Sequence, residues 1–485
     1  MAADLDALDA LDATAHARLI ADGELSAREA VQAAVERIEA RNPTLNAVIW
    51  SDPEAALDAA ARFDAARRAD GDDGPGAPFA GVPFLLKDIG ADQAGLPHWS
   101  GNGALRDAGH RSSADTELGR RFRAAGLVTI GKTNLPELAS VPVTQPHAFG
   151  PTRNPWDLDR SPSGSSGGAA AAVAAGLVPI AHANDGGGST RLPAAWCGLV
   201  GLKPTRGRVP VPEMISRSVA ELVVTRTVRD TARLLDAVHG ATTADLYRAP
   251  EGPADGYDLG STRVPPLRIG LLTTAGRYEV DPSCRDAAEA TAAVLEAAGH
   301  TVVPLGDEVL LGERSEVNGR LWMSALAREV DRLGELVGRP LTADEVEPYN
   351  WTAAERGRAL SAVELVAAQE AQQAWVAAVD AWMGQVEVLV TPTCPTPAQR
   401  TADLEPPVDE PWRIGRAYGR IGVFTMPFNV TGHPAISLPV AHDDGLPVGV
   451  QLVAAMGRED TLLALARHLE DAVPWRDRRP DLSYR

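Results

Sequence analysis

Residues 160–205 constrain this chain more than any other stretch of its sequence. Two glycine-serine clusters flank an alanine-rich segment there, with Ser165 and Ser166 in the first cluster and Ser189 in the second. Glycine has no Cβ and accepts φ values that other residues avoid, so backbone N–H groups beside such serines can approach a bound atom closely. Oxyanion-binding sites are built from N–H groups presented in this way. The stretch therefore indicates a serine-dependent active site.

Composition and charge exclude several classes of protein. The 485 residues suffice for one large α/β unit or for two to three ordinary domains. An apolar fraction of 45% with 23% charged residues is typical of a globular protein rather than a disordered or collagen-like one. The net charge of −19, with no basic cluster, argues against nucleic acid and anionic membrane surfaces as partners.

The cysteines and the N-terminus indicate a cytoplasmic protein. Cys197, Cys284 and Cys394 are widely spaced and odd in number, which fits a reducing compartment rather than a disulfide framework. There is no CxxC or HExxH pattern, so we expect no metal. The acidic N-terminus lacks the basic start and apolar core of a signal peptide. The longest apolar run, 169–181, is broken by Gly and Pro and is too short to span a bilayer.

Hydrophobic periodicity predicts a sheet with helices on its faces. Two helices are expected within 13–40, the second opened by a capping box at Ser26 and Glu29 and ended before Pro43. A strand at 267–272, a helix at 282–298 and a strand at 301–303 follow a βαβ rhythm. The pattern is nearly all helical over 313–384 and returns to a strand at 386–390.

Residues 126–133 match the phosphate-loop pattern GxxxxGK[ST]. In a true phosphate loop the four residues between the glycines form a loop that follows a strand. Here those four residues, Leu-Val-Thr-Ile, themselves read as a strand, and Pro136 follows soon after. We therefore do not expect nucleotide binding.

A nucleophile elbow, GxSxG, is matched by residues 164–168 with Ser166 at its centre. An elbow requires a strand immediately before it. The preceding segment, 154–162, carries two prolines and three charges, which disfavours a buried strand. We therefore do not expect an α/β-hydrolase.

The same stretch resembles the signature of the amidase signature family. The family patterns GGSSGG, TDxGGSxRxPA and GxxGxKPT correspond to SGSSGG at 163–168, NDGGGSTRLPA at 184–194 and GLVGLKPT at 198–205. The likeness covers nearly the whole chain, with further matches at 81–88, 131–134, 154–156, 226–230, 391–393 and 428–439. It implies an α/β fold with a mixed, twisted sheet wrapped by helices, and amide C–N hydrolysis with no metal or organic cofactor.

The family's catalytic group comprises a nucleophilic serine, a second serine preceded by a cis peptide, and a lysine. The resemblance assigns these roles to Ser189, Ser165 and Lys87. A serine hydroxyl needs a base to take its proton. A lysine serves as that base only when burial favours its neutral form, which the apolar residues before Lys87 allow. The expected oxyanion donors are the backbone N–H groups of Gly186, Gly187, Gly188 and Ser189.

Other polar residues in the motifs have simpler interpretations. Ser166 is expected to cap the helix that begins at 167, since serine is a favoured N-cap. Asp185 and Arg191 are expected to hold the loop by ion pairing. The remaining residues with structural interpretations are His182 as a packing or pocket-wall residue, Lys132 as a loop or ion-pair residue, and Cys197 as a buried thiol.

Two positions depart from the family pattern. Ser163 stands where the first glycine is usual, and Asn184 stands where Thr or Ser is usual. Neither change removes a catalytic atom, so both bear on substrate choice rather than on activity.

Within the family, the chain resembles the bacterial branch that includes 6-aminohexanoate cyclic-dimer hydrolase, through residues 181–185, 325–330, 338–342 and 457–460. That branch has a cysteine near its pocket where this chain has Trp322. An indole in place of a thiol would shrink or reshape the site.

We predict a single domain over 1–485, with the core signature at about 80–240 and a helical insert at about 305–385 walling the substrate site. The expected substrate is a small uncharged amide, linear or cyclic, and a homodimer is a possible assembly. Candidate pocket residues are Gln145, Phe149, Trp196, Trp322, Phe424 and Asn429.

Two other functions stay open. The chain could be the glutaminase subunit of a tRNA-dependent amidotransferase, which would need partner subunits. It could also be a non-enzymatic binding scaffold of the same fold, although all three catalytic positions are filled.

Overall fold

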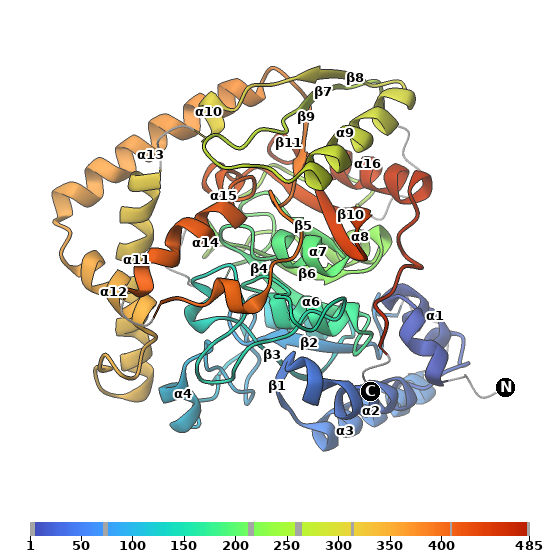
Figure 1. The fold of residues 1–485 in the computed structure, drawn as a ribbon. Helices are drawn as coiled ribbons and strands as arrows, with labels where there is room; N and C mark the ends of the chain where they lie inside the picture. The colour runs from blue at the N-terminus through green and yellow to red at the C-terminus, as the bar shows by residue number, and fades with distance from the viewer. Residues whose placement is uncertain are drawn as a thin grey trace.

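A mixed β-sheet runs through the centre of the molecule (Figure 1). The computed structural model describes residues 5–70, 76–211, 218–257, 264–311, 315–407 and 410–482. Across these residues the sheet has 11 strands in the order β1-β3-β2-β4-β6-β5-β10-β11-β9-β7-β8. The strands are β1 Val48–Ser51, β2 Pro83–Lys87, β3 Val128–Thr133, β4 Ile180–Asp185, β5 Val200–Lys203, β6 Ala220–Thr225, β7 Arg268–Leu271, β8 Thr301–Pro304, β9 Val388–Pro392, β10 Ala435–Asp443 and β11 Leu446–Ala454.

Helices surround this sheet, as the sequence predicts (Figure 1). They are α1 Ala13–Ala21, α2 Ala27–Leu45, α3 Pro53–Asp70, α4 Gly103–Asp107, α5 Glu117–Ala124, α6 Gly167–Ala174, α7 Arg191–Cys197, α8 Val228–Val238, α9 Pro282–Ala297, α10 Glu308–Leu311, α11 Ser315–Val337, α12 Pro348–Arg358, α13 Ala362–Met383, α14 Gly415–Ile421, α15 Met426–Thr431 and α16 Glu459–Ala472. Short 3-10 turns are η1 Leu5–Ala10, η2 Glu137–Ala139, η3 Thr401–Leu404 and η4 Pro411–Ile414.

The predicted pair of N-terminal helices is present as α1 and α2. The capping box at Ser26 and Glu29 is confirmed, with both reciprocal hydrogen bonds formed. The predicted end of α2 before Pro43 is wrong, because the helix continues to Leu45. Asn46 then closes it in a left-handed conformation with φ 51°. In this last turn the missing N–H of proline costs one hydrogen bond and does not stop the helix.

The phosphate-loop match is a strand. β3 runs through Gly131, Lys132 and Thr133, which would form the loop of a nucleotide site. A Cβ on Gly131 would lie 2.4 Å from the carbonyl oxygen of Trp50 on β1, so the close strand pairing requires glycine. The Lys132 side chain is buried, 3.7 Å from Asp92 Oδ1, which confirms its ion-pair interpretation.

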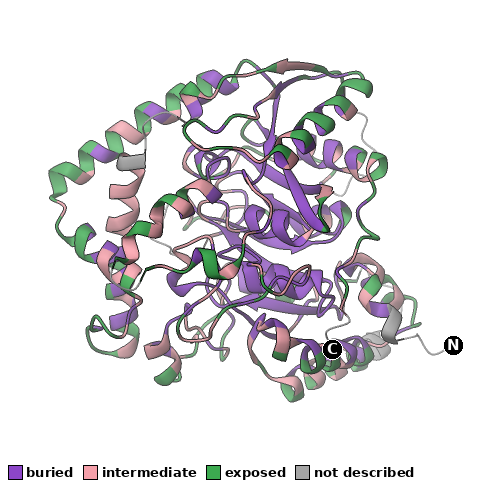
Figure 2. Cartoon of the chain, in the orientation of Figure 1, coloured by how far each residue is buried: buried purple, intermediate pink, exposed green. Residues whose placement is uncertain are grey.

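The nucleophile-elbow match also lacks its strand. In the described segment 154–162, pairing is limited to isolated bridges from Asn154 and Arg160. α6 follows the first glycine-serine cluster and is buried along its whole length, as is most of the central sheet (Figure 2). Its small residues allow close approach: a Cβ on Gly168 would lie 2.5 Å from the backbone nitrogen of Asn134.

The predicted βαβ rhythm and the helical segment are confirmed. β7 and β8 pair in parallel around α9. Helices α10 to α13 lie between β8 and β9, within the predicted insert 305–385, and α11, α12 and α13 stand together at one side of the sheet (Figure 1). That the whole chain forms a single domain stays a prediction.

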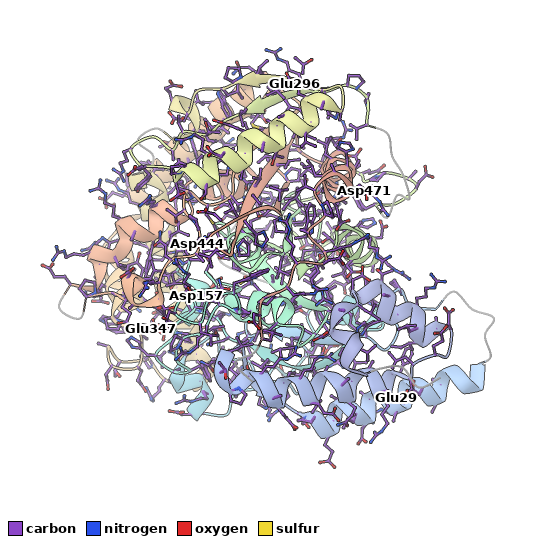
Figure 3. The ribbon with its side chains drawn as sticks, turned by 45° about the vertical axis from the view of Figure 1, so that its right-hand side comes forward. Glu29, Asp157, Glu296, Glu347, Asp444 and Asp471 are labelled. Atoms are coloured by element: carbon purple, nitrogen blue, oxygen red, sulfur yellow. The ribbon has the colours of Figure 1, made fainter. Side chains whose placement is uncertain are left out.

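The net negative charge is spread over the surface rather than gathered in one element. Exposed carboxylates lie on elements far apart in the fold, such as Glu29 on α2, Glu296 on α9 and Asp471 on α16 (Figure 3). In the described part of the chain, no helix is both long and apolar enough to cross a membrane.

Candidate active site

Lys87 is the last residue of β2, between β3 and β4 in the sheet. β2 is parallel to β4, so Lys87 and the end of β4 lie at the same edge. The Lys87 side chain is completely buried, and three oxygens lie within hydrogen-bond distance of its Nζ. They are Ser165 Oγ at 2.6 Å, Ser166 Oγ at 2.9 Å and Asn184 Oδ1 at 2.6 Å.

Burial lowers the pKa of Lys87 from 10.5 to about 7, even though the charges of Glu221 and Asp185 act in the opposite direction. Near neutral pH a substantial fraction of the lysine is therefore uncharged. A neutral amine next to a serine hydroxyl can accept that hydroxyl's proton.

The first glycine-serine cluster brings two serine hydroxyls to this lysine. Ser165 follows a cis peptide bond from Gly164, and Ser165 and Ser166 are both fully buried. The expected capping by Ser166 is wrong in its side-chain contact: Ser166 stands at the N-cap of α6, but its Oγ makes no capping bond. Lys87 Nζ donates to that Oγ, and the hydroxyl itself donates to the carbonyl of Asn184 at 3.2 Å.

Ser163, one of the two departures from the family pattern, has φ 64°, which explains why glycine is common at this position. Its hydroxyl donates to the carbonyl of Pro142 at 3.0 Å. That bond offers partial compensation for the left-handed backbone.

Ser189 lies in the turn between β4 and α7 and is partly exposed. Its carbonyl accepts a hydrogen bond from the backbone N–H of Ser166 at 3.2 Å, which joins the two serine clusters. Asp185 holds the turn from the other side, accepting the N–H of Gly188 at 2.7 Å and that of Thr190 at 3.3 Å.

The contact with Asp185 changes one sequence prediction. The N–H of Gly188 points to a carboxylate and not, as expected, to a developing oxyanion. Among the described residues, the N–H groups of Gly187 and Ser189 have no hydrogen-bond partner. A Cβ on Gly187 would meet nothing within 4 Å, so one side of this residue faces open space.

Asp185 is itself held by a buried ion pair with Arg191, as predicted. Arg191 Nε lies 2.8 Å from Asp185 Oδ2, and both side chains are fully buried. Although burial by itself would raise the pKa of Asp185, the Arg191 charge and hydrogen bonds lower it to about 2. Arg191 also donates to Gln451 Oε1 and Asn429 Oδ1, each at 2.6 Å.

Comparison with known proteins agrees with this geometry. A family model described as Amidase matches residues 29–463. The chain belongs to the amidase signature family. It is an amidase, a hydrolase of C–N bonds.

Individual relatives match this amidase over nearly its full length. A 6-aminohexanoate-cyclic-dimer hydrolase from Pseudomonas sp. (strain NK87) is 42% identical, over 97% of this chain and 96% of the relative. A solved structure of a 6-aminohexanoate cyclic dimer hydrolase has a TM-score of 0.90 at 40% identity, covering 98% of this chain and 99% of that one. A bacterial aryl acylamidase structure has a TM-score of 0.86 at 27% identity, covering 96% and 98%.

Three of the predicted pocket residues are almost completely buried. Trp196 is 1% exposed and donates to the carbonyl of Thr396, and Phe424 is fully buried. Asn429 is 1% exposed and donates to the carbonyl and the carboxylate of Asp185, besides its contact with Arg191. Asn429 therefore helps to hold the Ser189 turn, and all three stay predicted pocket residues.

The other three candidates are partly exposed. Gln145 donates to the carbonyl of Leu404 at 3.0 Å, and Phe149 stacks on Trp99 with 5.6 Å between ring centroids. Trp322, on α11, belongs to an aromatic cluster from four elements. Its other members are Tyr349, Trp412 and Tyr418, with neighbouring ring centroids 5.0–6.3 Å apart.

This aromatic cluster is connected to the Ser189 turn through α14. Tyr418 lies on α14, and Gly422 and Thr425 follow that helix. Thr425 donates from its hydroxyl to the carbonyl of Gly187 at 2.8 Å. The segment that follows α14 therefore contacts the backbone of the Ser189 turn.

The sequence analysis missed the hydrogen-bonded chain of Asn184, Glu221 and His182 next to Lys87. His182 Nε2 lies 2.7 Å from Glu221 Oε2, and the ring packs against Phe122, so its packing interpretation is confirmed. Glu221 was not singled out at all, and Asn184 only as a departure. Glu221 faces Asn184 across the antiparallel pair of β6 and β4, a pairing that no local motif encodes.

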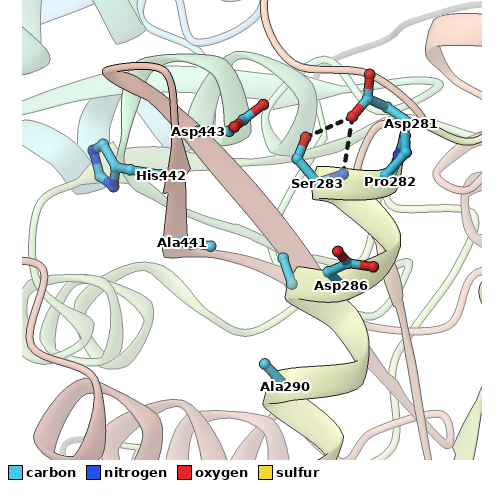
Figure 4. Close-up of a pocket in the computed structure, with 9 residues that line it drawn as sticks. Asp281, Pro282, Ser283, Asp286, Ala290, Ala441, His442 and Asp443 are labelled. Atoms are coloured by element: carbon cyan, nitrogen blue, oxygen red, sulfur yellow. Dashed lines mark hydrogen bonds between the residues drawn. The ribbon is translucent and has the colours of Figure 1, made fainter.

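Two hollows on the surface lie away from these residues. The larger, about 630 Å³, lies between the start of α9 and the end of β10 (Figure 4). It is lined by Asp281, Ser283, Asp286, His442 and Asp443, among others. Neither hollow is lined by Lys87 or the three serines. Within the described ranges, no three His, Cys, Asp or Glu side chains are grouped to hold a metal ion.

Proposed function

We propose that this amidase cleaves its substrate through an acyl-enzyme on Ser189, with Ser165 and Lys87 as the proton relay. The observation that carries the proposal is the 2.6 Å contact between the buried Lys87 Nζ and Ser165 Oγ. The hydrogen bond from Ser166 to Ser189 supports it, because it keeps the second serine cluster beside the first.

In the first half-reaction, neutral Lys87 takes the proton of Ser165 as Ser165 takes that of Ser189. The Ser189 oxygen attacks the amide carbonyl carbon and forms a tetrahedral intermediate. The N–H groups of Gly187 and Ser189, with that of Gly186 as a further candidate, stabilise its oxyanion; losing one such donor typically costs about 100-fold or more in rate.

The C–N bond breaks when the leaving nitrogen receives the proton back through Ser165, and the amine departs from an ester on Ser189. Water then attacks this ester and gives its proton to the same relay. The acid product leaves, and Ser189 regains its hydrogen.

For the substrate, we propose a small uncharged amide, linear or cyclic, with an apolar acyl part. The aromatic cluster of Trp322, Tyr349, Trp412 and Tyr418 supports this choice, since such rings bury apolar groups well. The cyclic dimer of 6-aminohexanoate, which names the relatives at about 40% identity, is a candidate within this class.

Hydrolysis of an amide panel tests both parts of the proposal. The panel contains aliphatic amides, anilides, the cyclic dimer and glutamine, and amine or ammonia release is measured. We expect turnover of uncharged amides, lost in Ser189→Ala. Trp322→Ala should accept bulkier acyl groups. Ammonia release from glutamine alone would favour the amidotransferase subunit instead, and no turnover and no serine labelling would favour a binding scaffold.

A further inference from the structure

Asn184 contacts the lysine of the proposed relay, although the reaction steps do not use it. Its Oδ1 lies 2.6 Å from Lys87 Nζ, as close as the hydroxyl of Ser165. An amide oxygen only accepts hydrogen bonds, so Lys87 must donate to it.

The hydroxyl of Ser166 also takes a hydrogen from the lysine. Ser166 donates its own hydrogen to the carbonyl of Asn184 at 3.2 Å. Because a hydroxyl has one hydrogen, its contact with Lys87 at 2.9 Å must be one in which Lys87 donates. A neutral amine has two N–H groups and one lone pair, and Asn184 and Ser166 occupy both N–H groups. The lone pair is left for the third neighbour, Ser165.

We propose that Asn184 is a positioning residue for the lysine base, which with Ser166 engages both N–H groups of neutral Lys87 and directs its lone pair at Ser165. The proposal rests on the proposed role of Lys87. Asn184 is thereby more than a substrate-choice variant of the family pattern.

The orientation of the Asn184 amide is set from behind by Glu221. Asn184 Nδ2 donates to Glu221 Oε1 at 3.4 Å, and His182 Nε2 contacts the other carboxylate oxygen at 2.7 Å. A Cβ on Gly90 would lie 2.7 Å from Glu221 Oε1 and 3.1 Å from Asn184 Nδ2, so the chain closes tightly over this contact. If the amide were flipped, its N–H groups would face Lys87 and its oxygen would face a carboxylate.

The amide also separates the lysine from a buried carboxylate. The charged groups that act on Lys87 are Glu221 from β6 and Asp185 from β4, and both favour its protonated form. Asp185 is paired with Arg191. Lys132 Nζ, from β3, donates to the backbone carbonyl of Lys87 at 3.4 Å. Asn184 accepts from Lys87 without adding a negative charge, which keeps the neutral amine accessible.

Two substitutions with opposite expected signs test this role. Asn184→Asp puts a carboxylate against Lys87 and should stabilise the ammonium form. Glu221→Gln removes a negative charge and should favour the neutral form. In the Gln variant, His182 can carry its proton on Nδ1, which has no partner among the described residues. His182 Nε2 can then accept from the new NH₂ group, and the Gln oxygen can still accept from Asn184.

The readout is the rate at which a fluorophosphonate modifies Ser189, measured from pH 5 to 9 and localised by mass spectrometry. This readout needs no known substrate. The acid limb is the low-pH part of this profile, where the rate falls as Lys87 is protonated. We expect it to move up by about one pH unit in Asn184→Asp and down by a similar amount in Glu221→Gln. At a fixed pH on the limb the rate should therefore fall about tenfold in the first variant and rise about tenfold in the second.

Asn350→Asp is the matched control. Asn350 is another buried asparagine that donates to a buried glutamate, Glu137, at 2.7 Å, and among the described residues its side-chain hydrogen bonds go to Glu137 and not to Lys87. It should lower the unfolding temperature and leave the acid limb in place. If Asn184→Asp does not fold, the downward shift in Glu221→Gln alone supports the proposal.

In the folded variants, the acid limb could instead stay at the wild-type pH while the rate falls equally at every pH. That result would overturn the positioning role of Asn184 and leave it a structural role. Failure of the proposed function is distinguishable, because wild type would then show no labelling of Ser189 or no acid limb at all.

Discussion

The backbone N–H of Ser166 donates a hydrogen bond to the carbonyl of Ser189 over 3.2 Å. This bond joins the two glycine-serine clusters of the sequence. On one side of it, Lys87 reaches Ser165 and Ser166, and on the other, Asp185 holds the Ser189 turn. The relative placement of the two serines is thus fixed by main-chain atoms, which mutation of either side chain leaves in place.

The two neighbouring glycines before Ser189 should respond differently to the same change. Gly188 has φ +128°, and a Cβ there would lie 2.2 Å from Thr425 Oγ1. We expect Gly188→Ala to lower the free energy of unfolding by more than about 2 kcal/mol. Gly187→Ala has space for its methyl group and should change stability by less than about 0.5 kcal/mol, while lowering kcat/KM because the methyl enters the open side of the site. Thermal unfolding and amide hydrolysis check this pair; equal stability losses would contradict it.

The buried ion pair of Asp185 and Arg191 should dominate the stability of the turn. Arg191→Met leaves the Asp185 carboxylate buried without its partner and should cost about 3–5 kcal/mol in urea unfolding. Arg339→Met breaks a surface pair with Glu345 and is the control, expected to leave unfolding nearly unchanged. Similar effects of the two substitutions would show that the turn does not depend on its ion pair.

Lys87 should make the protein less stable at low pH than at high pH. Between pH 7 and 10.5 the lysine is neutral when folded and protonated when unfolded, so the unfolded state binds more protons and stability rises with pH. Lys87→Met removes this dependence. The difference, variant minus wild type, in the free energy of unfolding should therefore be largest near pH 6. It should decline by about 1.4 kcal/mol per pH unit between pH 7 and 10.5. Urea unfolding at pH 6, 8 and 10 measures this slope, and a difference independent of pH would mean that the folded lysine is charged.

The sequence indicated candidate site residues more readily than the contacts between them. Motif positions indicated Lys87, Ser165 and Ser189, and the ion pair of Asp185 with Arg191, because these residues lie in contiguous blocks. The contact of Asn184 with Lys87 requires that β4 lie beside β2, and that of Asn184 with Glu221 requires that β6 lie beside β4. Such pairings depend on the whole sheet, and local periodicity carries no information about them.

Errors arose where a residue type serves several roles. Trp196 and Phe424 are predicted to line a pocket, and their burial shows that both rings also pack in the interior. Ser166 was expected to cap a helix, and a nearby lysine engages its hydroxyl instead. Pro43 marked a helix end one turn too early, because the last turn tolerates a missing donor.

The account's central claim is that neutral Lys87, through Ser165, activates Ser189. The most direct test is the rate of fluorophosphonate modification of Ser189 from pH 5 to 9, in wild type and in Lys87→Met. The account predicts a rate that rises about tenfold per pH unit below about pH 7 and then levels off, and that is lost in the variant. A flat profile, or modification of another residue in place of Ser189, would contradict it.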